Sequence, residues 1–531
     1  MATLTLGASV DHWPPAMLEG GTITARSATS MTYISDLGYT VTLQGTGLTY
    51  DDDGLPSGGT MTRVTVVKDS TAYADYNGVS LDFARAGMLL FGYDEQNGGH
   101  HGPDVFTFVN LLLKFDDLMI GTSGNNSFTG THGNDTIEAG AGDDDIGGEG
   151  GNDVMDGGDG WDTLRYSDAN YSWESYRGLN LDAATGIVVD CWGDTDTISN
   201  FEHYGDSLYS DTLKGSDVDE EFRLSRGNDV VNGRGGFDWV RYDEVDHWGA
   251  QRGVNVNLST GIARDSWKGT DTLSNVEGVE GSIFNDTLTG NALDNAFSGG
   301  QGVDVIDGGG GVDALVFWWT GGNGSGHGVS VNLSKVVNVL DDGYGNAETA
   351  LSIEEVEGSR SADRLTGSTG RNFLWGNDGN DTINGLGGAD DLGGGWGNDA
   401  INGGNGNDSL GGNGDNDTVT GGSGVDQFYF GWDLVDVGVD QITDFAAGSE
   451  TIWVGAWWGG NFLTENLVAN QFRSGAGVTT ANSTTQRFIY NSTTGDLYFD
   501  ADGSGTGSAS VRFATLTNLA ALTFNDIHIM F

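Results

Sequence analysis

Short apolar segments recur along this chain at a spacing of nine residues. Moving nine residues at a time from Asp135 gives Asp144, Asp153 and Asp162, and an apolar residue lies two positions after each acid. A single apolar position between two polar ones is typical of a very short strand with one inward side chain. The glycines before each acid supply the positive φ angles of a sharp turn. The pattern therefore predicts one strand and one turn in every nine residues.

The same register occupies four blocks of the chain, and the apolar position is filled throughout. The residues that open the nonapeptides are Asp117, Asn126, Asp135, Asp144, Asp153 and Asp162; Asp211, Glu220, Asp229 and Asp238; Asp286, Asn295, Asp304 and Asp313; and Asp363, Asn372, Asp381, Asp390, Asp399, Asp408, Asp417 and Asp426. Two nonapeptides would close one turn of a coil, and successive turns would stack as parallel strands about 4.8 Å apart.

Stacking would align the acids of alternate nonapeptides in rows, where like charges repel unless cations lie between them. Calcium fits such rows because it takes six to eight oxygen ligands, including the carbonyls of Gly-rich turns; magnesium requires a tighter octahedron and keeps its water. The predicted ligands of multiple Ca²⁺ ions are Asp135, Asp144, Asp153, Asp162, Asp229, Asp238, Asp304, Asp313, Asp381, Asp390, Asp399, Asp408, Asp417 and Asp426. The second position of each block (Asn126, Glu220, Asn295 or Asn372) lies in a poor glycine context and is not predicted to be a full ligand.

Three segments of eight residues, 157–164, 403–410 and 421–428, follow the pattern G-G-x-G-x-D-x-U closely, where U is apolar. They resemble the repeats of the repeats-in-toxin (RTX) family. The resemblance implies a parallel β-roll, one calcium ion between stacked turns, and export by a type I secretion apparatus. The expected fold class is all-β: an RTX solenoid with inserted β segments, preceded by a small β-sandwich-like domain.

Composition agrees with a cation-dependent chain. There are 91 Gly and only 4 Pro, and 77 acids against 22 Lys and Arg give a net charge of −55. Such a surface disfavours nucleic acid and anionic lipid, and self-repulsion keeps the chain expanded until cations neutralise it. Cys191 is the only cysteine, so no intrachain disulfide is expected. Neither an N-terminal secretory signal nor a membrane span is recognisable, so no membrane insertion is expected.

A longer unit of about 75 residues lies above the nonapeptides. The breaks between blocks end in similar segments, residues 196–202, 271–277 and, more loosely, 351–357. Each break also contains a strand-like alternation, for example at 253–258 and 328–333. The inserts either decorate a continuing solenoid or divide it into short rolls. The sequence leaves both arrangements open.

Three domains are expected: an N-terminal β domain at 1–115, the calcium-binding roll at 116–430, and a roll cap with a secretion signal at 431–531. In the first, Asp51, Asp52 and Asp53 form either a cation site or an acidic loop tip. His100 and His101 near Asp104 suggest zinc only weakly, because adjacent side chains on a strand point apart, and a polar loop is favoured.

The third domain carries two further resemblances to RTX tails. Residues 439–445 are similar to a segment that closes the roll, and residues 495–505 are similar to another tail element, in which Asp500 and Asp502 form either a cation site or an Asx turn. The last residues, 525–531, place an acid before apolar residues and look like an uncleaved type I export signal.

Three functions are compatible with these features. The favoured one is a secreted, extracellular or cell-surface structural protein that folds on calcium and self-assembles into a surface layer (S-layer), coat or matrix. The second is a secreted hydrolase, although neither His-Glu-x-x-His nor Gly-x-Ser-x-Gly is present and no catalytic residue is predicted. The third is an adhesin that binds cell-surface polysaccharide through tryptophans such as Trp318, Trp319, Trp457 and Trp458, which otherwise pack at strand edges.

Overall fold

The computed structural model describes most of the chain after residue 116. The described residues are 117–130, 133–166, 177–243, 252–317, 327–335, 338–431, 438–458 and 465–531, together with the backbone of six strands between residues 2 and 82. The predictions for Asp51–Asp53, His100, His101, Asp104, Trp318 and Trp319 lie outside the described residues, as does the side chain of Asp117.

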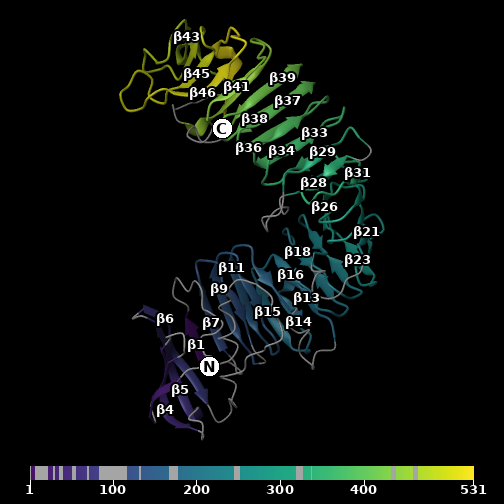
Figure 1. Cartoon of the computed structure of the whole chain (residues 1–531), viewed down its shortest axis with the longest axis vertical. Coiled ribbons are helices and arrows are strands. Elements are labelled where there is room, and N and C mark those ends of the chain that lie inside the picture. Colours follow the sequence, from purple (N-terminus) through teal and green to yellow (C-terminus); the bar gives the residue numbers. More distant parts are fainter. Residues whose placement is uncertain are drawn as a thin grey trace. The chain divides into compact units, whose positions relative to one another are not determined.

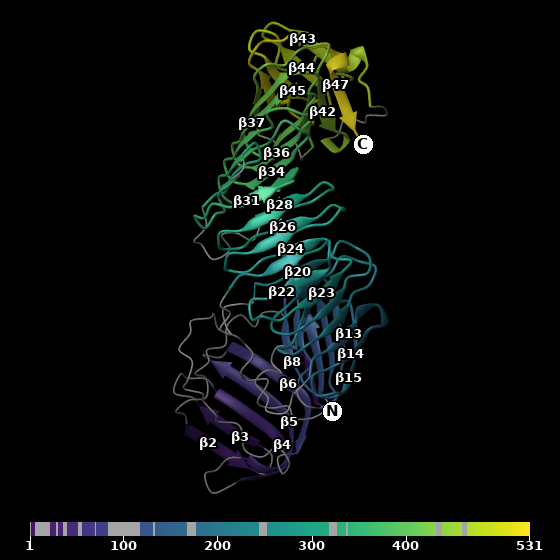
Figure 2. The same cartoon turned by 90° about the vertical axis from the view of Figure 1, so that its right-hand side faces the viewer.

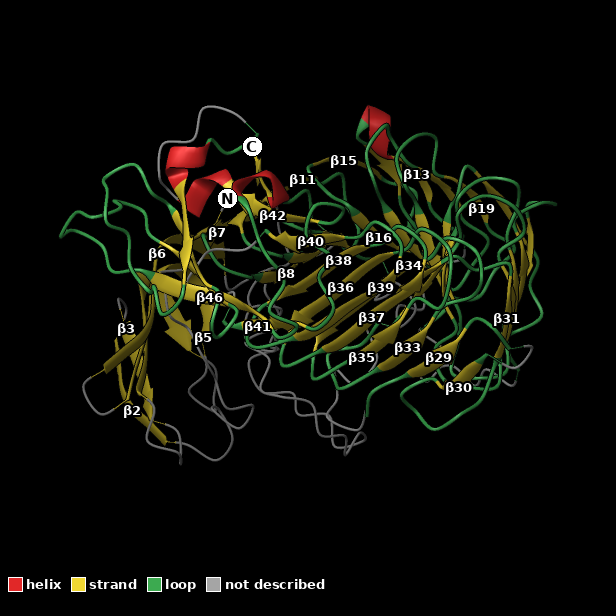
Figure 3. Ribbon diagram, turned by 90° about the horizontal axis from the view of Figure 1, so that it is seen from above, coloured by secondary structure: helices red, strands yellow, loops and turns green. Residues whose placement is uncertain are grey.

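The described residues are almost entirely strands and turns, which confirms the all-β prediction (Figure 3). Their helical segments are single 3₁₀ turns: η2 (Ala183–Thr185), η4 (Ala456–Trp458), η5 (Ala469–Gln471) and η6 (Phe524–Asp526). None of these is long or apolar enough to cross a membrane. Internal contacts divide the chain into unit 1, formed by residues 1–247 and 262–276, and unit 2, formed by residues 248–261 and 277–531.

Each unit is built from coils whose strands stack in parallel, as Figures 1 and 2 show. In unit 1, β17 (Thr212–Lys214) pairs in parallel with β19 (Val230–Asn232), so that residues eighteen apart lie side by side. In both of these strands the central residue is buried, while its neighbours are exposed or half-exposed. This is the single inward side chain that the nonapeptide pattern predicts, and the parallel β-roll is confirmed.

The strands of unit 1 form two faces of a roll. One face contains, in spatial order, β1 (Ala2–Thr5), β7 (Asp117–Thr122), β9 (Thr136–Ala141), β11 (Val154–Asp159), β15 (Thr195–Ser199), β14 (Ile187–Val189), β13 (Asn180–Asp182), β17, β19, β23 (Asp271–Ser274) and β22 (Ile262–Arg264). The other contains β8 (Ser127–Thr129), β10 (Asp145–Gly147), β12 (Thr163–Leu164), β16 (His203–Gly205), β18 (Glu221–Arg223) and β20 (Trp239–Arg241).

Unit 2 repeats this architecture and closes it at the C-terminus. One set of strands is β21 (Asn255–Asn257), β25 (Thr287–Thr289), β27 (Val305–Asp307) and β31 (Thr349–Leu351). A second is β24 (Gly278–Glu280), β26 (Ala296–Ser298), β28 (Ala314–Val316), β32 (Glu355–Glu357), β34 (Phe373–Asp378), β36 (Asp391–Trp396), β38 (Ser409–Asn413), β40 (Gln427–Phe430), β42 (Thr451–Gly455) and β47 (Ile527–Met530). The third is β30 (Val339–Asp341), β29 (Ser330–Asn332), β33 (Arg364–Thr366), β35 (Thr382–Asn384), β37 (Ala400–Asn405), β39 (Thr418–Ser423), β41 (Asp440–Ile442), β46 (Val511–Leu516), β45 (Asp496–Phe499), β44 (Phe488–Asn491) and β43 (Phe472–Gly475).

The inserts do not interrupt the coil within either unit. In unit 1, β11 pairs in parallel with β15 beyond the first insert, and β19 pairs with β23 beyond the second. The first insert contributes the antiparallel pair β13 and β14, which extends the same sheet before β17 continues it. Within a unit, therefore, the inserts decorate a continuing solenoid.

The N-terminal strands form a separate arrangement. A five-stranded antiparallel sheet contains β2 (Thr22–Ser27), β3 (Ser30–Ile34), β4 (Thr40–Tyr50), β5 (Pro56–Lys68) and β6 (Thr71–Asp82). The second sheet that a sandwich requires is not among the described residues. β1 instead pairs in parallel with β7 and extends the roll.

The core of the roll is the column of apolar residues two positions after the repeating acids. All of them, from Met119 to Phe428, are at most 3% exposed. At the C-terminal end, β46 pairs with β41 and β47 pairs with β42, so that Ile527 and Ile529 are buried on the last coil. The final residues of the chain are thus folded as a strand of the roll.

Candidate metal centre: two rows of buried acids

Each repeating acid lies immediately before a strand and is held by the coil next to it. The backbone N–H of Asp381 donates to Asp399 Oδ1 at 2.8 Å, and the N–H of Asp399 donates to Asp417 Oδ1 at 2.8 Å. Such a bond from the residue eighteen positions earlier reaches Asp144, Asp153, Asp162, Asp229, Asp238, Asp304, Asp313, Asp381, Asp390, Asp399, Asp408, Asp417 and Asp426. The structure thereby brings the predicted acids together in rows, one acid per coil.

The second carboxylate oxygen of most of these acids is buried without a hydrogen-bond partner. This applies to Oδ2 of Asp144, Asp153, Asp162, Asp229, Asp304, Asp313, Asp381, Asp390, Asp399, Asp408, Asp417 and Asp426. The side chains themselves are at most 2% exposed. Because a buried, unpaired carboxylate oxygen is costly, native proteins pair such groups or place a cation beside them.

The turn before each acid leaves room for such a cation. A Cβ added to Gly403 would come within 3.0 Å of Asp408 Oδ2 and of the Gly421 carbonyl oxygen in the next coil. Gly376, Gly385 and Gly394 are surrounded in the same way. The residues four and two positions before the acid both have positive φ for Asp144, Asp153, Asp162, Asp238, Asp304, Asp313 and the six predicted ligands from Asp381 to Asp426, as at Gly404 (101°) and Gly406 (148°), but not for Asp229. A carboxylate oxygen and turn carbonyls therefore converge on one small space, a donor set that suits Ca²⁺.

Replacing Gly403 with Ala is expected to weaken calcium binding at this turn by about 1–3 kcal/mol, because the methyl group would occupy the space between Asp408 Oδ2 and Gly421 O. Gly310→Ala is the matched control: a Cβ there meets nothing within 4 Å, so a change below about 0.5 kcal/mol is expected. Calcium titration monitored by circular dichroism compares the two midpoints. Equal midpoints would show that the space around Gly403 does not hold the ion.

Burial makes these carboxyl groups poor acids when no cation is present. It raises the pKa of Asp381 to about 7 and that of Asp390 and Asp399 to about 6, against backbone hydrogen bonds that lower it. The pKa of Asp153 rises further, to about 9, first by burial and then by the charges of Asp196, Asp135 and Asp190. A cation beside Oδ2 would remove this penalty by balancing the charge.

The acids and amides that were not predicted to be full ligands have a different turn. At the start of a block, the N–H of Ser359 donates to Asp363 Oδ2 at 2.7 Å and its hydroxyl donates to Oδ1 at 2.8 Å. Ser207 and Ser282 bind Asp211 and Asp286 in the same way. At the second position, turn amides donate to Asn126, Glu220, Asn295 and Asn372. A protein N–H thus occupies the position that is left open in the other turns.

Comparison with known proteins identifies the repeat. A sequence model described as the RTX calcium-binding nonapeptide repeat (4 copies) matches residues 115–146, 143–170, 280–315, 357–392 and 393–428. The chain carries RTX calcium-binding repeats. The matched ranges include all the predicted ligands except Asp229 and Asp238.

Two further comparisons give less. No curated protein matches the chain. Among solved structures, the solution structure of the AlgE6R3 subunit from the Azotobacter vinelandii mannuronan C5-epimerase is similar over 32% of this chain and 78% of that chain, with 23% sequence identity and a TM-score of 0.19.

The structure adds acids to the RTX rows that the sequence did not reveal. The N–H of Asp153 donates to Asp196 Oδ1 at 2.9 Å, although 43 residues separate them. The same bond joins Asp162 to Glu202, Asp229 to Asp271, Asp313 to Glu354 and Asp417 to Asp440. The segments 196–202 and 271–277 are similar in sequence, but their distance from the nonapeptides along the chain conceals their place in the rows.

Each insert also brings a further buried acid toward the row, and this too was missed. Asp190 Oδ1 accepts the N–H groups of Trp192, Gly193 and Asp194, while its Oδ2 has no partner. Tyr166 donates to Asp196 Oδ2 at 2.6 Å, and in the next repeat Tyr242 donates to Asp271 Oδ2 at 3.1 Å. A tyrosine hydroxyl therefore donates a hydrogen bond to the second carboxylate oxygen of Asp196 and of Asp271, whereas that of Asp190 has no partner.

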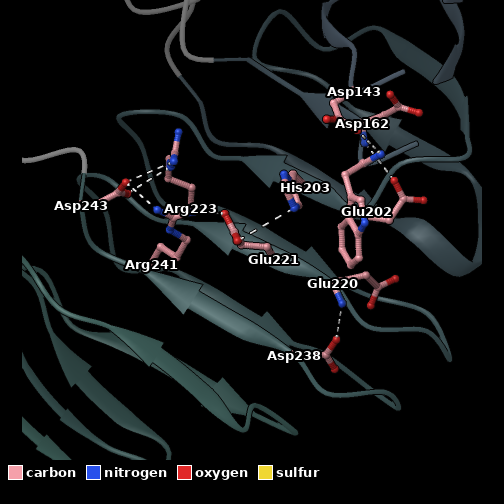
Figure 4. A network of polar contacts seen from close by, with 11 residues as sticks. Asp143, Asp162, Glu202, His203, Glu220, Glu221, Arg223, Asp238, Arg241 and Asp243 are labelled. Atoms are coloured by element: carbon pink, nitrogen blue, oxygen red, sulfur yellow. Dashed lines mark hydrogen bonds and ion pairs between the residues drawn. The ribbon is translucent and has the colours of Figure 1, made fainter. Parts of the chain in front are cut away.

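Unit 1 has two rows of acids, and Figure 4 shows the one that contains Asp162, Glu202, Glu220 and Asp238, beside a network of ion pairs. Asp162 and Glu202 lie in this row with Glu220 and Asp238, joined through backbone N–H donors at 3.0 and 2.9 Å. On the strands that follow, Arg241 pairs with Glu221 at 2.7 Å and with Asp243 at 3.2 Å, and Arg223 pairs with Asp243 at 3.1 Å. Arg223 and Arg241 thus form ion pairs with Glu221 and Asp243, which are not row acids. These ion pairs add modest local stability to the RTX roll.

The remaining candidates lie in the C-terminal part of unit 2. Asp502 Oδ2 accepts the N–H of Gly507 at 2.7 Å, which lowers the pKa of Asp502, and Asp500 Oδ2 accepts the Ser510 hydroxyl at 2.8 Å. The Oδ1 atoms of both acids are buried without a hydrogen-bond partner. Trp458 packs against Phe430 and Phe513 and is 7% exposed, whereas Trp457 is 54% exposed.

Proposed function

We propose that the chain is a secreted calcium-binding protein that folds when it reaches calcium outside the cell. The observation that carries this proposal is the row of buried acids, each with one oxygen bound to the neighbouring coil and the other without a partner. The proposed ligands are the predicted acids whose second carboxylate oxygen has no hydrogen-bond partner. Asp196, Asp271 and Asp440 continue the rows, but tyrosines already donate to the second oxygens of Asp196 and Asp271. Calcium would supply positive charge and link oxygens of adjacent turns.

The chain's own charge makes folding conditional. With a net charge of −55, the calcium-free chain resists compaction, and each coil that forms buries another carboxylate. Any cation that binds only the stacked turns moves the equilibrium toward the fold. An expanded chain where calcium is scarce would also suit passage through a type I exporter.

Circular dichroism and hydrodynamic radius of the full chain test this proposal. At neutral pH we expect an expanded chain with little β structure in chelator, and a cooperative gain of β structure with compaction when calcium is added. Magnesium at the same concentration is the control and is expected to have a much weaker effect. A chain that is compact and β-rich in chelator would contradict the proposal.

A structural, self-associating role is the finer proposal. In unit 1, Val154 and Ile187 lie on either side of Thr197 in adjacent strands, and Val230 and Ile262 lie on either side of Thr272. These four apolar side chains are 38–49% exposed, on an otherwise acidic protein. An outward apolar stripe that recurs with each insert favours contact between copies in a layer or coat.

Electron microscopy in calcium and in chelator distinguishes this role from the alternatives. Sheets or filaments in calcium would support self-assembly, and dispersed single particles at high concentration would contradict it. Retention on a glycan array would instead favour polysaccharide binding through exposed tryptophans such as Trp161 and Trp396, which are 55% and 47% exposed.

A further inference from the structure

An acid replaces a glycine at one turn of unit 1. The residue five positions before the first acid of a block is Gly281 before Asp286 and Gly358 before Asp363. A Cβ at Gly358 would come within 3.0 Å of Asp363 Oδ2 and of the Gly376 carbonyl oxygen. In the block that starts at Asp211, this position is Asp206. A carboxylate therefore enters a space that the blocks starting at Asp286 and Asp363 leave to a glycine.

Asp206, Asp211 and Asp229 form a cluster of buried carboxylates. One oxygen of each lies within 4.8 Å of the others. Their side chains are 3%, 1% and 1% exposed. Three negative groups this close and this deeply buried repel one another strongly unless a cation lies among them.

The hydrogen bonds at the cluster leave one oxygen open toward it. In a capped turn, the residue four positions before an acid donates its N–H to the side chain of that acid, as Ser207 does to Asp211. Ser225 has this position before Asp229, but its N–H donates to Asp206 Oδ2 at 2.8 Å. Asp229 Oδ2 is consequently left without a hydrogen-bond partner. The presence of Asp206 has thus redirected the donor that would have capped Asp229.

The turn at Asp229 also differs from the open turns of the RTX rows. Neither Ser225 nor Gly227 has positive φ, in contrast to the paired positive-φ positions of those turns. A Cβ at Gly227 would come within 3.0 Å of both Asp229 carboxylate oxygens and of the Tyr209 carbonyl oxygen. The oxygens available here are three carboxylates and a nearby carbonyl rather than one carboxylate and several turn carbonyls.

We propose that Asp206, Asp211 and Asp229 form a separate cation site, built from three carboxylates, that holds one calcium ion at a lower free concentration than the nonapeptide turns. A set of oxygens selects a hard divalent cation, and affinity rises with the number of charged ligands. The site would stay occupied when the rows begin to empty, and it would keep the coils β17 and β19 together in unit 1. This inference rests on calcium binding by the chain as a whole.

The test is the number of calcium ions that the full chain retains as free calcium is lowered. Native mass spectrometry after equilibration in calcium buffers counts them for the parent and for Asp206→Asn, which removes one charge while keeping size. We expect the variant to retain one ion fewer at the lowest calcium concentrations at which the parent still binds, and to lose that ion at about tenfold higher free calcium.

Two further variants sharpen the result. Asp206→Gly restores the residue found at 281 and 358 and is expected to lose the same ion while folding in high calcium. Asp217→Asn removes the same charge from an exposed side chain of the same unit and is expected to behave as the parent. Unchanged retention in both Asp206 variants would overturn the proposal, because Asp206 would then not be a ligand of any retained ion. A parent that retains no calcium would instead overturn the proposed function.

Discussion

In calcium-stripped buffer, the chain is expected to gain β structure as the pH is lowered from about 8 to about 5.5. Protons would then take over part of the role of calcium. Burial raises the pKa of Asp381 to about 7, that of Asp399 to about 6 and that of Asp153 to about 9, from an ordinary value of 3.8. The folded chain therefore binds protons at pH values where the unfolded chain has released them.

The sign of the effect follows from proton linkage. Where the folded state binds more protons than the unfolded state, the free energy of unfolding falls as the pH rises. The contribution of these acids to calcium-free stability is thus fully present below their ordinary pKa and is lost as the pH rises through about 6 to 9. Calcium binding has the opposite dependence, because protons compete with the ion for the same oxygens.

Circular dichroism across this pH range, with and without calcium, measures both effects. The lower limit of about 5.5 avoids the isoelectric region, where low net charge promotes precipitation. We expect two curves that cross: β structure declining with pH in stripped buffer, and β structure rising with pH in dilute calcium. A stripped chain that loses β structure on acidification would contradict the buried, unpaired state of the row acids.

Replacing Asp381, Asp399 and Asp417 together with Asn is expected to make this part of unit 2 fold with less calcium and bind fewer ions. The Asn Oδ1 can still accept the N–H of the preceding coil, while an uncharged NH₂ group replaces the unpartnered oxygen. An amide already has a place in the same row at Asn372, in the opposite orientation: its Oδ1 accepts the N–H of Ser368 and its Nδ2 donates to the Glu354 carbonyl at 3.2 Å. Removing three buried charges lowers the cost of forming the calcium-free coils.

The measurements are β content in chelator and the number of bound ions by native mass spectrometry. The charge-matched control is Asp217→Asn, Asp378→Asn and Asp415→Asn in one chain, because these three acids are exposed. We expect higher β content in chelator and up to three fewer ions in the row variant only. Equal ion counts in the two triple variants would show that the row acids do not bind calcium.

The repeat could be read from sequence because it is local. An acid, an inward apolar residue two positions later and glycines in front are all contained in nine residues, and burial of every residue from Met119 to Phe428 in that apolar position confirms the interpretation. The strand-like alternation at 253–258 and 328–333 likewise became β21 and β29, each paired in parallel with a strand of the roll. The β-roll and its inserts were therefore predictable.

Contacts made across the inserts were not predictable in the same way. Asp196 takes its place after Asp153 although the chain between them is 43 residues long, because register is set by the stacking of coils and not by distance in sequence. The difference between an open and a capped turn was only suggested by glycine content, and it depends on where single N–H groups such as that of Ser359 point.

The sequence by itself determined the period, the inward column, the turns and the acidic charge of this protein, since each follows from short-range spacing and side-chain chemistry. Only the tertiary structure decided which acids are open to a cation, how the rows continue past the inserts, and that Asp206 meets Asp211 and Asp229. The physical reason is that a buried carboxylate is defined by its neighbours. Those neighbours come from coils whose distance along the chain varies with every insert.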